Sequence, residues 1–182
     1  TLTFPHDIWI DVLHGKSRII ASLIFDFYDY DADGFKELFL TSSNCVYILN
    51  YTGRIEKNIT IPNDDPIPID LADIDNDGSI DIVVGCAYGT VYALSINGQP
   101  LWAFSTGATV FDLEVYDINN DSRLEIIAGS GSRLCIINNS GNLLWSYTTS
   151  TDINDIEIAD IDNDNRSEII WIIIHQLMNI II

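Results

Sequence analysis

Basic residues are scarce in this sequence. It contains 8 Lys and Arg against 27 Asp and Glu, which gives a formal net charge of −19 at pH 7. A chain this acidic is repelled by the phosphate backbone that dominates nucleic-acid affinity. We therefore expect no nucleic-acid partner.

The residues and motifs of common active sites are also sparse. The three cysteines, Cys45, Cys86 and Cys135, form no disulfide framework, and we expect them to be small buried residues within strands. The three histidines share no motif, and the sequence has no G-x-S-x-G, phosphate loop or Cys-x-x-Cys. We therefore predict no catalytic residues and no enzymatic activity.

Long apolar runs and helical periodicity are missing as well. The most apolar stretch, residues 169–182, has 14 residues and is interrupted by His175, Gln176 and Asn179. A membrane helix needs about 20 predominantly apolar residues. We therefore expect no membrane insertion.

An acidic loop is present in four copies. The second copy, Asp73-Ile74-Asp75-Asn76-Asp77-Gly78-Ser79-Ile80-Asp81, has carboxylates at positions 1, 3, 5 and 9 and glycine at position 6. The first residues of the copies lie 44, 44 and 43 positions apart, and a fixed period of this size is typical of repeat architectures. The candidate metal ligands of the four loops are Asp29, Asp31, Asp33, Glu37; Asp73, Asp75, Asp77, Asp81; Asp117, Asn119, Asp121, Glu125; and Asp160, Asp162, Asp164, Glu168.

The spacing of these oxygens predicts calcium sites. Alternate short side chains in a tight loop point at one centre, and Ca²⁺ takes about six to eight oxygen ligands in a flexible cage. Glycine at position 6 permits the positive φ of a sharp turn, and position 7 is placed to offer a backbone carbonyl. A single copy would be an ordinary acidic turn, but four copies at a constant period favour up to four bound Ca²⁺ ions. The third loop departs most, with Asn119 at position 3 and Ser122 at position 6.

Each repeat contains four short apolar segments with the composition of strands. In the third unit we predict strands over 110–116, 125–130, 133–138 and 143–149. Four strands in about 44 residues match one blade of a β-propeller. We therefore predict an all-β chain, a single β-propeller domain over residues 1–182. Its blades are expected at about 20–62, 66–107, 110–150 and 153–182.

The number of strands leaves the closure of the ring open. The fourth unit has three strands, and residues 8–13 supply one spare strand at the N-terminus. If the two pair, the N-terminal strand completes the last blade and a ring of four blades closes. The alternatives are a piece of a larger propeller and a half-ring that forms a homo-oligomer.

A second acid recurs three residues before each loop, on the strand expected to line the propeller axis. These acids are Asp26, Asp70, Glu114 and Glu157. One reading is a cation-binding ring in the central channel. The other reading, which we favour, is that each accepts a hydrogen bond from the backbone, or pairs with a basic residue, of the next blade.

The loops and the strands that follow them resemble the FG-GAP/VCBS repeats of integrin-α-type propellers. The segment Asp81-Ile82-Val83-Val84-Gly85 after the second loop carries this resemblance, although the Phe-Gly and Gly-Ala-Pro segments that name the family are absent. Residues 91–102 and 139–145 are similar to blades of quinoprotein-like (PQQ-type) propellers. The resemblance implies calcium held between the first and second strand of each blade, in a structural role away from the ligand face.

The quinoprotein-like resemblance also implies that a tryptophan docks each blade on the next. Trp102 and Trp145 occupy this position, whereas the first repeat has Glu56 and Lys57 there. We therefore interpret both tryptophans as structural.

The function expected from this reading is binding. We predict a calcium-stabilised extracellular or cell-surface module for adhesion or interaction, with a protein or glycan as its unidentified ligand. The alternatives are a structural block of a surface layer or filament and a part of a carbohydrate-active enzyme.

Overall fold

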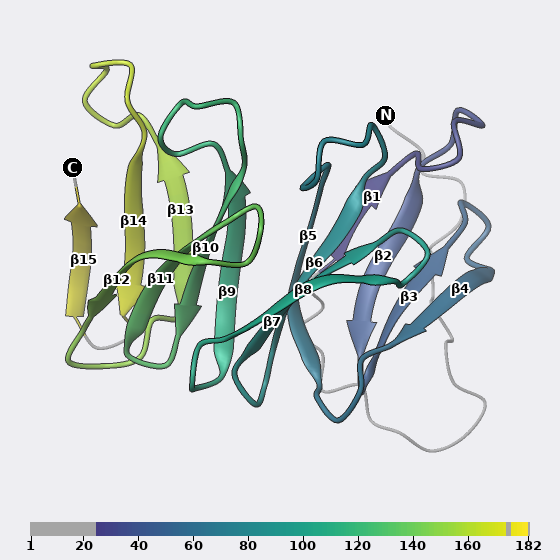
Figure 1. Ribbon diagram of the computed structural model, residues 1–182, viewed down its shortest axis with the longest axis horizontal. Helices are drawn as coiled ribbons and strands as arrows, with labels where there is room; N and C mark the ends of the chain where they lie inside the picture. The colour runs from purple at the N-terminus through teal and green to yellow at the C-terminus, as the bar shows by residue number, and fades with distance from the viewer. Residues whose placement is uncertain (1–24, 174–175, 182) are drawn as a thin grey trace, which may run out of the picture.

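The protein is all-β in the part that the structure describes. The computed structural model describes residues 25–173 and 176–181, which hold fifteen strands and no helix. The strands form four separate antiparallel sheets, of four, four, four and three strands (Figure 1). In each sheet the strands follow one another in chain order, so each sheet is a meander joined by tight turns.

The first two sheets are complete four-stranded blades. The first contains β1 (Phe25–Tyr28), β2 (Glu37–Ser42), β3 (Cys45–Leu49) and β4 (Ile55–Thr60). The second contains β5 (Pro66–Ala72), β6 (Asp81–Cys86), β7 (Thr90–Ser95) and β8 (Pro100–Ser105).

The third sheet repeats this plan and the fourth has one strand fewer. The third contains β9 (Val110–Tyr116), β10 (Glu125–Ser130), β11 (Arg133–Asn138) and β12 (Leu143–Thr148). The fourth contains β13 (Asp155–Ala159), β14 (Glu168–Ile173) and β15 (Gln176–Ile181). The four strands predicted for the third unit are confirmed, with β12 ending one residue earlier than expected.

The register also repeats from blade to blade. The third and fourth strands of each complete blade shift register at equivalent positions, between Ile48 and Leu49, Ala93 and Leu94, and Ile136 and Ile137. Such irregularities bend a strand and increase its twist. The outer hairpins therefore curve in the same way in all three blades.

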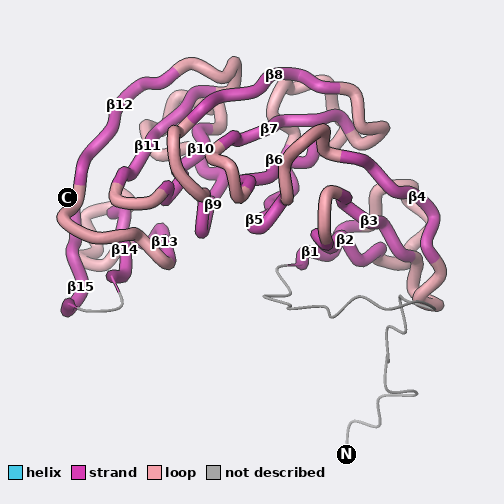
Figure 2. Tube along the Cα trace, turned by 90° about the horizontal axis from the view of Figure 1, so that it is seen from below, coloured by secondary structure: helices cyan, strands magenta, loops and turns pink. Residues whose placement is uncertain are grey.

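The four blades stand side by side along an open arc. Figure 2 shows the first strands β1, β5, β9 and β13 on the concave side and β4, β8 and β12 on the outside. Neighbouring first strands contact one another in the order β1, β5, β9, β13. The connections between the first and second strands of all four sheets lie at the same end of the molecule (Figure 1).

The hydrophobic core consists of three layers between adjacent blades. Phe39 and Ile48 pack against Ile82 and Val84 of the second blade, and the next two junctions are built in the same way. Because β6 and β10 are covered on both faces, every residue along them is buried. This explains why these strands read as continuous apolar runs rather than as an alternating pattern.

Small residues set the spacing of the blades. A side chain at Gly85 of β6 would clash with Val110 and would come within 2.8 Å of Pro68. The equivalent Gly129 of β10 has the same relation to Ile153, at 2.7 Å. The junctions therefore depend on glycine at this position of the second strand.

The expected N-terminal strand at residues 8–13 lies outside the described residues. The four described sheets do not close on one another, and β15 is the edge strand of the last sheet. The closure of the ring therefore stays a prediction. No helix in the described ranges has the length and apolarity needed to cross a bilayer.

Candidate functional site

Each acidic loop is anchored by its last acid, the first residue of the second strand in its blade. These four closing acids are only 2% exposed, and they are Glu37, Asp81, Glu125 and Glu168. One carboxylate oxygen of each accepts a hydrogen bond from the backbone N–H of the second loop residue, at 2.9–3.2 Å. A buried carboxylate is costly unless it is hydrogen-bonded or paired. The same anchor is thus kept in all four loops.

The remaining acids of the loop organise its backbone. In the second loop the two oxygens of Asp73 accept hydrogen bonds from the N–H groups of Asp77 and Gly78, both at 3.0 Å. Asp75 accepts a second bond from the N–H of Asp77 at 3.1 Å. The other three loops repeat this pattern, including an asparagine oxygen at position 3 of the third loop. The side-chain oxygens at positions 1, 3 and 5 therefore fold each loop in the same way.

Two positions of every loop adopt left-handed backbone conformations. The sequence predicted this for position 6, where Gly78 has φ 87°, and Ser122 and Asn165 adopt φ 66° and 68° without being glycine. Position 4 is also left-handed in all four loops, with φ 58–62°. The sequence analysis missed this second position, although asparagine, which tolerates such geometry, occupies it in three loops.

Carboxylates crowd together closely enough to share a cation in three of the loops. One oxygen from each member lies within 4.8 Å of the others in the groups Asp29, Asp31, Asp33; Asp73, Asp75, Asp81; and Asp160, Asp162, Asp164. The third loop carries one carboxylate fewer, because Asn119 stands at position 3. The amide of Asn119 donates a hydrogen bond to Glu125 at 3.2 Å. The donor set is oxygen only, as hard divalent cations prefer, and so fits Ca²⁺. Whether ions bind the sixteen candidate ligands stays a prediction.

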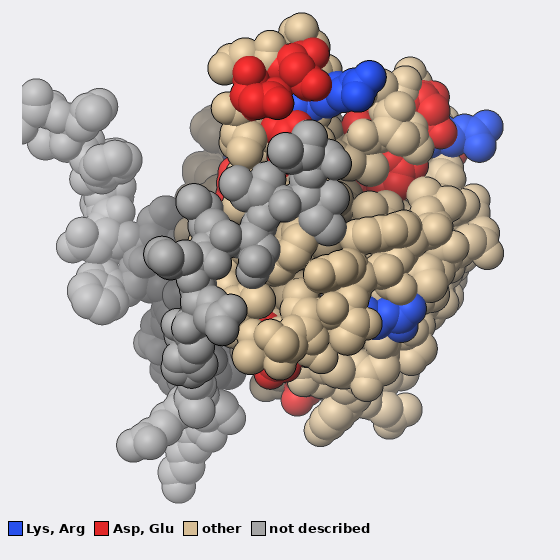
Figure 3. Space-filling view, turned by 90° about the vertical axis from the view of Figure 1, so that its left-hand side faces the viewer, with Lys and Arg blue, Asp and Glu red and all other residues tan. Residues whose placement is uncertain are grey.

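Burial and neighbouring acids raise the pKa of three of the four closing acids. Burial raises the pKa of Asp81 to about 6, and the neighbouring charges of Asp75 and Asp77 act in the same direction. Burial likewise raises the pKa of Glu37 and of Glu125. The acidic loops, which connect the first and second strands of the four sheets, lie at the same end of the molecule. Figure 3 shows acidic side chains gathered at the upper end of the face that it views. A divalent cation bound in each loop would neutralise part of this charge.

The acids on the first strands connect neighbouring blades. Asp70 accepts a hydrogen bond from the N–H of Val115 in the next blade at 2.8 Å, which confirms the interpretation we favoured for that residue. Asp112, which lies two residues before the repeat position of Asp70, accepts a hydrogen bond from the N–H of Ile156 in the next blade at 2.7 Å. Burial, together with the charges of Asp70 and Asp112, raises the pKa of Glu114 to about 7. Asp70 and Asp112 therefore belong to the junctions between blades, whereas Asp26 accepts a hydrogen bond from the N–H of Phe27 in its own strand. For Glu114 and Glu157 the interpretation stays a prediction.

The docking role expected of Trp102 is confirmed. Its indole N–H donates to the backbone carbonyl of Asn139 in the next blade at 2.9 Å. A methyl group at Gly141 of the same turn would lie 2.9 Å from the Trp102 ring. Trp145 instead stacks on Tyr147 of its own strand, with ring centroids 6.0 Å apart, and is 40% exposed.

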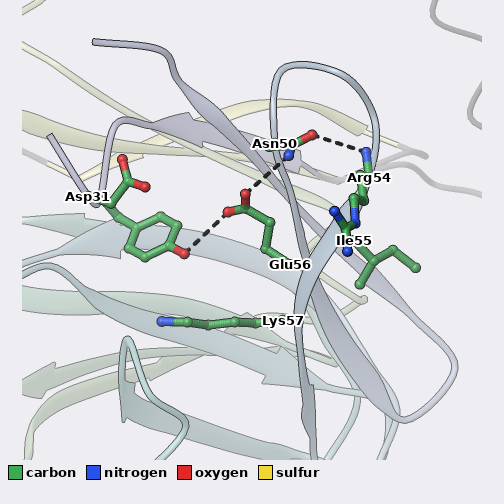
Figure 4. Close-up of a pocket in the computed structure, with 7 residues that line it drawn as sticks. Asp31, Asn50, Arg54, Ile55, Glu56 and Lys57 are labelled. Carbon is green, nitrogen blue, oxygen red and sulfur yellow. Dashed lines mark hydrogen bonds between the residues drawn. The ribbon is translucent and has the colours of Figure 1, made fainter. Parts of the chain in front are cut away.

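A pocket of about 360 Å³ opens on the first blade, beside its acidic loop. Figure 4 shows the side chains that line it, from the loop, the turn after β3 and strand β4. Glu56 lies at its centre and accepts hydrogen bonds from the Tyr30 hydroxyl at 3.3 Å and from the Asn50 amide at 3.1 Å. Lys57 lies over the Tyr30 ring, 4.6 Å from its centroid. The pocket therefore combines acidic, basic and aromatic groups.

The sequence indicates this pocket through departures from the repeat. Glu56 and Lys57 stand where the next two repeats have leucine and tryptophan, and Tyr30 stands where the other three loops have isoleucine. The pocket is the place where the first blade differs from the repeat.

Solved structures with a similar fold are β-propeller proteins. The Vibrio cholerae biofilm matrix protein Bap1 is 26% identical, with a TM-score of 0.65, over 81% of this chain and 23% of its own. BBS1N in complex with ARL6DN is 17% identical, with a TM-score of 0.65, over 86% of this chain and 50% of its own. A chain of the humanized Chaetomium thermophilum Polycomb Repressive Complex 2 is 14% identical, with a TM-score of 0.71, over 87% and 37%.

The similarities to BBS1N and to the Polycomb complex show the fold alone. The chain spans half or less of the length of each of the three proteins. No curated protein matches the sequence. A family model described as FG-GAP-like repeat matches it three times, at residues 29–84, 73–128 and 117–171. Each match begins at the first acid of a loop and runs into the second strand of the next blade. The matches together cover most of the sequence, and the chain therefore belongs to the FG-GAP-like repeat family.

Proposed function

We propose that the protein is a calcium-stabilised β-propeller module that binds a partner outside the cell and has no catalytic role. The observation that carries the proposal is the buried closing acid of each loop, 2% exposed and joined to the loop backbone. It couples the oxygens of the loop directly to the second strand, which lies at the centre of the core.

The residues that would hold the ion are the sixteen candidate ligands of the four loops. Bound calcium would supply positive charge to crowded carboxylates and would tie the first strand of each blade to the second. Because an ion that binds only the folded state stabilises it by mass action, the loops would make the stability of the propeller depend on calcium. Acids that hold calcium are poor proton acceptors, which argues against catalysis at the loops.

The loops are also compatible with an extracellular location, which we propose for the protein. Sites of modest affinity, with dissociation constants of about 10⁻⁴–10⁻³ M, are typical of extracellular calcium modules. Bap1, which is 26% identical to this chain, is a biofilm matrix protein. A matrix or cell-surface module is the corresponding proposal here.

Two measurements test the proposal. Thermal unfolding in Ca²⁺, in Mg²⁺ and in EDTA should show a melting temperature that calcium raises by many degrees and that magnesium raises less. A melting temperature that is unchanged in EDTA would remove the calcium role. Glycan and protein arrays probed with and without EDTA should show calcium-dependent binding, and arrays without any bound partner would contradict the binding role.

A further inference from the structure

The first blade differs from its repeats at one place, and the differences converge on the pocket beside Glu56. Arg54 replaces the amides Gln99 and Asn142 of the next two blades, and Glu56-Lys57 replaces Leu-Trp. Tyr30 replaces isoleucine at the second loop position. Four of the residues that line the pocket thus depart from the repeat together. A site for one specific ligand on a repeat scaffold has to be built from such unrepeated residues.

We propose that this pocket binds one neutral sugar unit of a glycan. The inference rests on the binding role proposed above and names the site and the chemical class of its ligand.

The acceptor at the centre of the pocket is held in place and has capacity left. Glu56 receives one hydrogen bond on each carboxylate oxygen, from Tyr30 and from Asn50. A carboxylate offers about four lone-pair sites, so two remain for ligand hydroxyls.

Two basic residues also line the pocket. The Arg54 guanidinium forms no hydrogen bond or ion pair with any residue that the structure describes. Lys57 uses one of its three donors on Asn97 Oδ1 of the next blade, at 3.2 Å, which fixes its position. Guanidinium and ammonium groups can both donate to the hydroxyl and ring oxygens of a sugar.

The mixture of groups favours a neutral polyol over a charged ligand. A cation would be opposed by Arg54 and Lys57. An anion would meet Glu56 on a chain whose net charge is −19. A sugar hydroxyl both donates and accepts, so one ring can satisfy acceptors and donors without introducing charge.

The pocket is also organised before any ligand arrives. Asn50 accepts hydrogen bonds from the N–H groups of Thr52 and Arg54, each at 3.1 Å, and so closes the turn that carries Arg54. Its amide N–H at the same time holds Glu56 (Figure 4). A preformed site loses less side-chain entropy on binding.

The test is a titration of the whole chain, in calcium, with neutral oligosaccharides of glucose, galactose and mannose, followed by NMR shifts of the backbone amides. Uronate oligosaccharides are the charged comparison. At least one neutral oligosaccharide should bind, with shifts centred on residues 50–57 and on Tyr30. Weaker binding of the matching uronate is expected.

Variants that restore the repeat locate the site. Glu56→Leu combined with Lys57→Trp should weaken binding at least tenfold, and Arg54→Gln at least fivefold. In each variant, calcium should raise the melting temperature by as much as it does in the parent. Arg133→Gln on β11 of the third blade removes the same charge outside the pocket and outside the acidic loops, and it should leave binding unchanged.

The outcomes separate this inference from the function on which it rests. Neutral glycans that bind the parent and the repeat-restored variants equally would overturn the site but keep the binding module. Preferred binding of uronates or peptides in the pocket would overturn the ligand class. If calcium stabilises the protein and no neutral oligosaccharide binds, the sugar assignment is wrong. If calcium has no effect, the proposed function itself fails.

Discussion

The closing acid of the second loop offers the sharpest test of how calcium and fold are coupled. Asp81→Asn keeps the size of the side chain and an oxygen that can accept the bond from the Ile74 N–H, which is 3.0 Å long in the native loop. It removes one charge from a residue that is only 2% exposed. The variant should therefore fold, and it should lose affinity for one ion.

The expected size follows from ligand linkage. An ion present at 100 times its dissociation constant stabilises the folded state by about 2.7 kcal/mol. For a chain of this length, 1 kcal/mol shifts the melting temperature by roughly 2–4 °C. Calcium should therefore raise the melting temperature of Asp81→Asn by roughly 5–11 °C less than that of the parent.

The parent should lose its stability advantage over Asp81→Asn when the ion is removed. Burial raises the pKa of Asp81 to about 6. At pH 7.5 without calcium, the parent therefore holds an unfavourable buried charge. Asp81→Asn lacks it and should be at least as stable as the parent in EDTA.

The assay is differential scanning calorimetry of the two proteins in calcium and in EDTA, with Asp65→Asn as the control. Asp65 is an exposed acid of the same blade that lies outside the loop, so the control makes the same charge change. If calcium raises the melting temperatures of the parent and of Asp81→Asn equally, the coupling of Asp81 to a bound ion is refuted.

The junctions between blades lead to three further predictions. Trp102→Ala should lower the free energy of unfolding, measured in urea, by about 3 kcal/mol, because it removes the bond to the next blade. Trp145→Ala should lower it less, because Trp145 is 40% exposed. Equal losses would contradict the docking role. Gly85→Val should destabilise by more than about 3 kcal/mol or prevent folding, because its side chain would clash with Val110, and native-like stability would show that the junction can shift. The pKa of Glu114 is raised from 4.5 to about 7, so the folded state binds more protons than the unfolded state between these values and loses stability as pH rises through them. Glu114→Gln should flatten this part of a pH–stability curve measured in EDTA and be more stable than the parent at pH 8, and parallel curves would contradict the raised pKa.

Much of the fold could be predicted because the repeat displays it several times. The constant spacing of the acidic loops located the boundary between first and second strands in every blade, and strands such as Glu125–Ser130 have the predicted bounds. The anchor bond of the closing acid follows from the same spacing, because position 9 begins the buried second strand.

Other features depend on contacts between segments far apart in the sequence. The bond from Asp112 to Ile156 joins two blades and has no local signature, since Pro68 occupies the equivalent position of the second blade. The pocket was missed for another reason. A search for repeats reads Tyr30 and Lys57 as departures from a pattern, and only the fold shows that the Lys57 ammonium lies over the Tyr30 ring.

The most direct test of the central claim is a count of bound calcium. Protein dialysed against millimolar calcium and analysed by isothermal titration and metal analysis should hold three ions of similar affinity. A fourth, weaker ion is expected at the third loop, where Asn119 replaces an aspartate. A chain that retains no calcium and melts at the same temperature in EDTA would contradict the account.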